Sequence, residues 1–131
     1  MKAKTGNVTK MKVLLVEDNA DDADLLRKTL GQVASTLFDL THVERLEEAL
    51  KRVREESFDA VLLDLSLPDS QGLDTITRAT LTAPSMPIVV LTGLDDENVG
   101  LEAVRKGAQD YLVKGKVDGS LVTRLNPRIL Q

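Results

Sequence analysis

FDAVLLDLSLPDSQG, residues 58–72, is the stretch on which the fold prediction depends. Its apolar run at residues 60–63 has the length and the β-branched content of a buried strand, and it stops at a single carboxylate, Asp64. Pro68 and the polar residues around it then forbid continuation of the strand and supply turn chemistry. We therefore expect Asp64 at the carboxyl end of a buried strand, facing a loop.

Short apolar runs and helical patterns alternate along the rest of the chain. Further strands are predicted at residues 12–17, 37–43, 88–91 and 111–113. Helices are predicted from residue 20, with Asn19 as cap, and at residues 44–56, 70–82 and 95–106, with a last helix from Asp118 that Pro127 should break early. About five alternations with short connections predict an α/β fold, a doubly wound and mostly parallel sheet with helices on both faces.

Composition narrows the class of protein. A chain of 131 residues with 42% hydrophobic and 29% charged residues suits one globular domain, which we place at residues 11–131 behind a flexible tail of residues 1–10. A net charge of -4 and only three aromatic residues (two Phe, one Tyr) argue against direct nucleic-acid binding. The absence of cysteine suits the cytoplasm, and the apolar runs are too short to span a membrane.

Five polar side chains follow the ends of four predicted strands. They are Glu17 and Asp18, Asp64, Thr92 and Lys114. Each one alone has an ordinary explanation as a helix-dipole partner, a turn residue or a solvated charge. In a parallel sheet, however, all strand ends of this kind meet at one edge, where ligands bind. Three clustered carboxylates repel one another unless a cation joins them, and their oxygen atoms suit Mg2+.

This arrangement resembles the receiver domain of two-component response regulators, over residues 11–125. The resemblance rests on four motifs in order: VLLVEDN, DAVLLDLSLPDSQG, PIVVLTG and DYLVKG. It implies a flavodoxin-like fold with strand order 2-1-3-4-5. It also implies that the chain is a signalling switch and catalyses only its own phosphorylation and dephosphorylation.

The resemblance assigns a role to each residue of the cluster. Asp64 would accept a phosphoryl group from a phosphohistidine on a sensor histidine kinase or a phosphotransfer protein. Asp18, Asp64 and the backbone carbonyl of Ser66 would bind Mg2+, with Glu17 acting directly or through water. The kinase and the downstream target that would complete the phosphorelay are not identified by the sequence.

Further residues match family positions that neutralise the phosphoryl group, signal its presence and set the lifetime of the acyl phosphate. Lys114 would pair with the phosphoryl oxygens, and Thr92 would donate a hydrogen bond to them. Tyr111 matches the switch aromatic, which is expected to turn inward when Thr92 moves. Ser66 and Leu94 occupy positions at which the family tunes the lifetime of the acyl phosphate. His42, on the second predicted strand, is expected to be a surface or edge residue.

The sequence departs from the family pattern at three places. Gly115 follows Lys114 where the family often has proline, Leu67 replaces a common methionine, and Pro127 should shorten the last helix. The surface that many members use to dimerise would then be incomplete, so we expect a monomer or a weak dimer.

Three alternatives stay open at this point. The chain is either a stand-alone regulator or a receiver fragment of a larger hybrid kinase or response regulator. A haloacid-dehalogenase-like phosphohydrolase also combines Asp, Thr, Lys and Mg2+, but its nucleophile normally ends the first strand and has another Asp two residues later. A third alternative is an interaction module with a vestigial site.

Overall fold

Five parallel strands form the central sheet of the protein. The structure is a computed structural model that describes residues 11–34 and 38–116. The strands lie in the order β2 (Phe38–Val43), β1 (Met11–Val16), β3 (Ala60–Asp64), β6 (Ile88–Thr92) and β7 (Asp110–Val113). Every pairing in this sheet is parallel. Counted among the strands of this sheet alone, the order is 2-1-3-4-5, as predicted.

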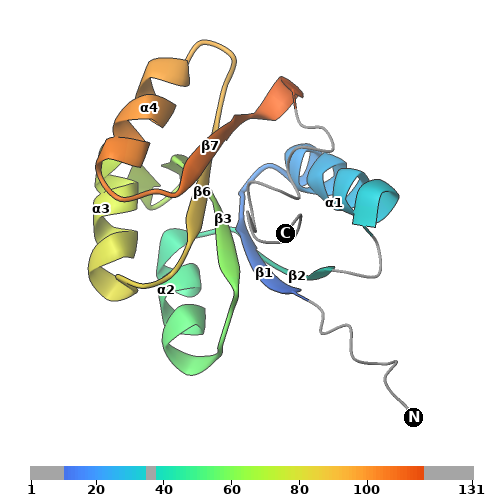
Figure 1. The fold of residues 1–131 in the computed structure, drawn as a ribbon, viewed down its shortest axis with the longest axis horizontal. Helices are drawn as coiled ribbons and strands as arrows, with labels where there is room; N and C mark the ends of the chain where they lie inside the picture. Colours follow the sequence, from blue (N-terminus) through green and yellow to red (C-terminus); the bar gives the residue numbers. More distant parts are fainter. Residues whose placement is uncertain (1–10, 35–37, 117–131) are drawn as a thin grey trace, which may run out of the picture.

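Helices of the described part of the chain lie on both faces of the sheet. Helix α1 (Ala20–Ala34) lies on one face, and α2 (Leu46–Glu55), α3 (Leu73–Thr82) and α4 (Glu97–Arg105) lie on the other (Figure 1). Helices on both faces of a parallel sheet confirm the predicted doubly wound α/β fold.

Asn19 caps α1, as predicted, because its Oδ1 accepts a hydrogen bond from the backbone N–H of Asp22 at 3.0 Å.

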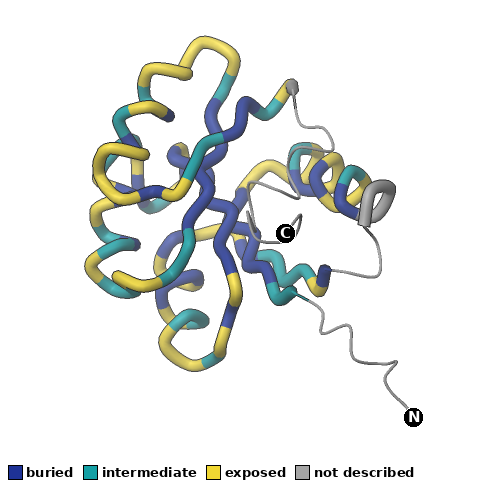
Figure 2. The backbone as a smooth tube through the Cα atoms, viewed as in Figure 1, coloured by how far each residue is buried: buried dark blue, intermediate teal, exposed yellow. Residues whose placement is uncertain are grey.

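Alternate side chains of each central strand enter two separate cores. Leu14, Val61, Leu63 and Val90 pack with apolar residues of α2, α3 and α4, such as Leu46, Ile76 and Ala103. Val13, Leu15, Leu62 and Leu91 pack with Ala23, Leu26 and Leu30 of α1. Figure 2 shows β3 and β6 buried along their whole length, and β1 is buried from Val13 onward. Burial on both faces explains why these strands read as continuous apolar runs in the sequence.

A short hairpin follows β3, where the sequence predicted a loop and then a helix from residue 70. Strands β4 (Ser66–Leu67) and β5 (Ser70–Gln71) pair antiparallel around the turn at Pro68. The helix predicted from residue 70 therefore begins only at Leu73, after Gly72 with φ of 63°. That left-handed backbone conformation is accessible to glycine at little cost, so the chain can leave the hairpin and enter α3 there.

The hairpin turn also caps a distant helix. Arg45, at the N-cap position of α2, makes no side-chain cap hydrogen bond. Instead, Oδ1 of Asp69 accepts a bond from the N–H of Leu46 and Oδ2 accepts one from the N–H of Glu47, both at 2.9 Å. Arg78 of α3 donates to the carbonyl oxygen of Asp69 at 3.2 Å. The hairpin is thus tied to both α2 and α3.

Some predictions lie outside the described residues. These are the flexible tail of residues 1–10, the helix from Asp118 and the effect of Pro127. Within the described residues, β7 continues into a short 3-10 helix, Lys114–Lys116. No helix in the described part of the chain has the length and apolar character that crossing a membrane requires.

Candidate functional site

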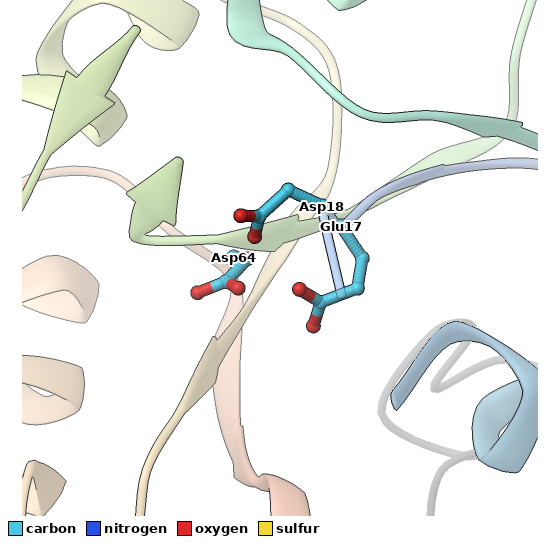
Figure 3. Close-up of side chains that lie close together, drawn as sticks. All are labelled: Glu17, Asp18 and Asp64. Carbon is cyan, nitrogen blue, oxygen red and sulfur yellow. The ribbon is translucent and has the colours of Figure 1, made fainter. Parts of the chain in front are cut away.

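Three carboxylates from the ends of two neighbouring strands converge at the carboxyl edge of the sheet. Glu17 and Asp18 follow β1, and Asp64 ends β3 beside it. Their side chains point toward one another (Figure 3), and one oxygen from each lies within 4.8 Å of the others. Glu17 and Asp64 are buried, whereas Asp18 is exposed. The structure thus brings together the three acids that the sequence predicted.

Lys114 reaches this cluster from the end of β7. Its Nζ lies 2.8 Å from Oδ2 of Asp64 and 2.7 Å from Oε1 of Glu17. A third carboxylate, Asp22, places its Oδ2 at 3.1 Å from the same ammonium group. Asp22 was not among the site residues predicted from the sequence. The signal in the sequence is its place in the first turn of α1, four residues after Asp18.

Burial and charge shift the protonation of the two central groups. Burial, and then the hydrogen bond and charge of Asp64, raise the pKa of Glu17 to about 7, although Lys114 acts in the opposite direction. Burial alone would lower the pKa of Lys114, but its contacts with Asp64 and Glu17 outweigh that effect and raise it above the ordinary value. The ammonium therefore stays charged near neutral pH, while the neighbouring acid resists ionisation.

The donor set fits a hard divalent cation. When all three carboxylates of the cluster are ionised, the one ammonium group leaves a net negative charge, even before the partly exposed Asp22 is counted. Oε1 of Glu17 is buried, and its contact with Lys114 is an ion pair that lacks the alignment of a hydrogen bond. A carboxylate oxygen has two lone pairs, so Oε1 can also coordinate a cation beside this ion pair. A Mg2+ ion, which prefers carboxylate oxygens and water, would supply the missing positive charge.

Backbone contacts hold the acids in place. The N–H of Ser66 donates to Oδ1 of Asp64 at 3.0 Å, and the N–H of Asn19 donates to Oε2 of Glu17 at 3.1 Å. His42, half-buried on the edge strand β2, lies with Nε2 2.7 Å from the carbonyl oxygen of Glu17. Because that carbonyl can only accept, Nε2 carries the proton and donates. His42 thus supports the turn after β1, a role that sequence reasoning missed.

Thr92 links the end of β6 to the strand that carries Tyr111. Oγ1 of the buried Thr92 donates to the carbonyl oxygen of Leu112, at 3.3 Å. Tyr111, one residue earlier on β7, is partly buried and packs against the core beneath α2, α3 and α4. A change at the Thr92 hydroxyl would therefore act directly on the backbone next to the aromatic residue.

A cleft of about 370 Å³ opens above these residues. Its lining includes Asp64, Ser66, Gln71, Thr92, Asp96 and Lys114. Leu94, on the loop after β6, is 64% exposed. The cleft gives the Asp64 carboxylate access to solvent, so a small anionic group attached there could be reached by Lys114 and Thr92.

Strand order and the position of the site define a doubly wound, flavodoxin-like α/β protein with an acidic site at its carboxyl edge. The chain belongs to the response regulator receiver domain family, whose family model matches residues 13–126. This membership favours a receiver over a dehalogenase-like phosphohydrolase.

Named relatives agree with this assignment. The chain is 37% identical over 116 residues to the two-component response regulator PhoP of Pseudomonas aeruginosa, covering 88% of this chain and 50% of that protein. It is 31% identical over 107 residues to the response regulator protein PilR of the same species, covering 82% and 23%. The chain thus spans half or less of the length of these relatives.

Solved structures show the same fold. A putative response regulator from Chloroflexus aurantiacus superposes with a TM-score of 0.79 at 26% identity, covering 94% of this chain and all of that one. Full-length FixJ from B. japonicum superposes with a TM-score of 0.79 at 28% identity, covering 94% of this chain and 59% of that one.

Proposed function

We propose that this chain is a phosphorelay switch that accepts a phosphoryl group on Asp64 from a phosphohistidine of a sensor histidine kinase or phosphotransfer protein in the cytoplasm. One observation carries the proposal: the buried Asp64 carboxylate ends a central strand at the floor of an open cleft, with the ammonium of Lys114 at 2.8 Å. Family membership supports the assignment.

In the transfer step, an oxygen of Asp64 attacks phosphorus as the P–N bond to the donor imidazole breaks, and the electron pair of that bond returns to the ring. Both the attacking carboxylate and the phosphoryl group are negative, so the site must cancel charge and fix the line of approach. Ser66 holds one oxygen of Asp64 through its N–H, which leaves the other facing Lys114.

Glu17, Asp18, Asp64 and the backbone carbonyl of Ser66 would hold Mg2+ in this proposal. When bound, Mg2+ supplies positive charge that neutralises the phosphoryl oxygens and the acids around them. Lys114, which lies between Glu17 and Asp64, then pairs with a phosphoryl oxygen.

The same cleft accounts for resetting of the switch. Water attacks the phosphorus of the acyl phosphate, the P–O bond to Asp64 breaks, and inorganic phosphate leaves. In this proposal Ser66, which lines the cleft, and Leu94, which is exposed after β6, would control how water approaches. By the same proposal the chain catalyses only its own phosphorylation and dephosphorylation.

The readout would begin at Thr92. Its hydroxyl bonds to the Leu112 carbonyl in the present structure, and a phosphoryl group on Asp64 would compete for that hydroxyl. Loss of the bond to β7 would then allow Tyr111, the preceding residue, to change position. The partner that recognises the changed surface would be the downstream target.

The direct test is labelling with acetyl phosphate and Mg2+, followed by intact mass measurement. We expect one added phosphoryl group on the wild type and none on Asp64→Asn. Asp39→Asn, at an exposed acid on β2, is the matched control and should be labelled like the wild type. Labelling that persists in Asp64→Asn would refute the assignment of the acceptor.

A further inference from the structure

Tyr111 lies against a part of α4 that has no side chain. A Cβ atom built on Gly100 would lie 2.6 Å from Cδ2 of the Tyr111 ring and 2.8 Å from its Cγ. Carbon atoms in contact prefer about 3.5–4.0 Å, so a methyl group at this position and the ring cannot occupy their sites together. The observed ring position therefore requires glycine at residue 100.

The backbone at this position does not itself require glycine. Gly72 and Gly107 are the glycines with positive φ among the described residues, so Gly100 adopts a conformation open to any residue. Gly100 lies inside α4 and is buried, a place where alanine stabilises a helix and glycine weakens it. The contact with Tyr111 is the feature that explains the glycine.

The contact bears on the proposed switch. Tyr111 precedes Leu112, whose carbonyl accepts the Thr92 hydroxyl. The ring position against Gly100 therefore belongs to the state in which Thr92 bonds to β7, which is the resting state of the proposed function. We propose that Gly100 is a positioning residue that stabilises the resting position of Tyr111 and so sets how readily the switch leaves it. The regulatory part of this inference rests on the proposed function, whereas the packing of Tyr111 against Gly100 does not depend on it.

The packing part is tested without phosphorylation by a double-mutant cycle. In a Tyr111→Ala background the ring is gone and the one close contact left to the added methyl group is with the Cβ of residue 111, at 3.1 Å, which a small shift relieves. Gly100→Ala should then raise the melting temperature by about 3 °C through the gain in helix propensity. In the wild-type background the added methyl group meets the ring, so the gain should vanish or turn into a loss. An equal gain in both backgrounds would overturn the proposal.

Tyrosine fluorescence provides a second test that does not depend on the stability of the Tyr111→Ala protein. Tyr111 is the one tyrosine of the chain, which has no tryptophan, so the emission reports this ring alone. Gly100→Ala should displace the ring from its position on α4 and so change its quenching by acrylamide. Leu101→Ala, at the neighbouring exposed position on α4, is the control and should match the wild type. Wild-type quenching in Gly100→Ala would refute the contact.

The link to the switch is tested with a phosphoryl mimic, beryllofluoride with Mg2+. In the wild type the mimic should shift the tyrosine emission. Before the mimic is added, the emission of Gly100→Ala should already lie nearer the value that the wild type reaches with the mimic. The mimic should then change the emission of Gly100→Ala by less than about half of the wild-type change, because the resting state is already disfavoured. A wild-type response in Gly100→Ala would overturn the regulatory role.

Failure of the proposed function and failure of the proposed role of Gly100 would give different experimental results. If Asp64 takes no label, the proposed function is wrong, while the melting and quenching results still decide the contact. If Asp64 is labelled normally and Gly100→Ala leaves quenching unchanged, the role of Gly100 is wrong and the proposed function stands.

Discussion

Glu17 and Asp69 are two acids whose pKa values move in opposite directions. Burial and the nearby Asp64 raise the pKa of Glu17 to about 7. Burial also acts against ionisation of Asp69, but the backbone N–H groups of Glu47 and Leu46 outweigh it and hold the pKa of Asp69 below its ordinary value. The chain itself thus stabilises the charge of Asp69, whereas it leaves the charge of Glu17 only partly compensated.

The difference separates structural from functional carboxylates. Both oxygens of Asp69 accept hydrogen bonds from the N-terminal end of α2, so the carboxylate charge needs no further partner. Glu17 shares one ammonium group with Asp64 and Asp22. A group left incompletely neutralised in this way has capacity for a ligand, and a cluster of such groups is a candidate site. Four substitutions, in decreasing order of their predicted consequences, test this contrast.

Lys114→Met should have the largest effect of the four substitutions, on the rate of phosphorylation. It keeps the length of the side chain but removes the charge that faces Asp64, so the initial rate of phosphorylation by acetyl phosphate should fall about 100-fold. Lys106→Met, at an exposed residue next to α4, should leave the rate unchanged. A rate within a few-fold of the wild type would show that Lys114 is not needed for charge cancellation.

Glu17→Gln should change stability with opposite sign in the absence and presence of metal. Because its pKa is raised from 4.5 to about 7, the wild type without metal loses stability as the pH rises through that window. Near pH 8, the substitution should therefore stabilise the metal-free protein, by about 2 kcal/mol in urea unfolding. At saturating Mg2+ the wild type should become the more stable one.

The exposed Glu48→Gln on α2 is the control for this reversal and should not show it. Destabilisation of the metal-free protein by Glu17→Gln would contradict the interpretation of Glu17 as an uncompensated acid.

Asp69→Ala should destabilise the protein by about 1 kcal/mol, through loss of the cap of α2. Asp69→Asn keeps one acceptor and should lose less. Since the folded pKa is depressed, the contribution is complete well above 3.8 and is lost as the pH falls through the folded value below it. Asp24→Ala, at an exposed acid of α1, should show no such pH dependence in urea unfolding. Equal curves for the two variants would show that the cap contributes nothing to stability.

Asp22→Ala should have the least consequence. The side chain of Asp22 is 36% exposed, so its ion pair with Lys114 is screened by water and contributes less than about 1 kcal/mol. We expect the rate of phosphorylation by acetyl phosphate to change by no more than about twofold. A change as large as that of Lys114→Met would place Asp22 within the essential site.

The sheet and the acidic cluster could be predicted because they depend on local patterns and one topological rule. Strands buried on both faces must be apolar throughout, so their ends were visible in the sequence within about one residue. Parallel strands also bring their carboxyl ends to one edge, which placed Glu17, Asp64 and Lys114 together before any contact was known.

The features that sequence reasoning missed depend on contacts between distant segments. The β4–β5 hairpin has only two residues in each strand, too few to give a periodic pattern. The cap of α2 comes from Asp69, which follows Leu46 by 23 residues, and the contact between Asp22 and Lys114 joins residues that are 92 positions apart. The roles assigned to Asp64, Thr92 and Ser66 remain predictions, and labelling of Asp64 tests the first of them.

The position of β7 in the sheet has a consequence for how such a domain can diversify. Among the described strands, β7 pairs with β6 alone and forms an edge, while the acids stand on the central strands β1 and β3. The negative charges are thus fixed by the most buried part of the fold, and the positive charge comes from its margin. A fused module or bound partner that bends this edge strand would move the ammonium group relative to the acids, and would thereby alter the sensitivity of the site without displacing the carboxylates.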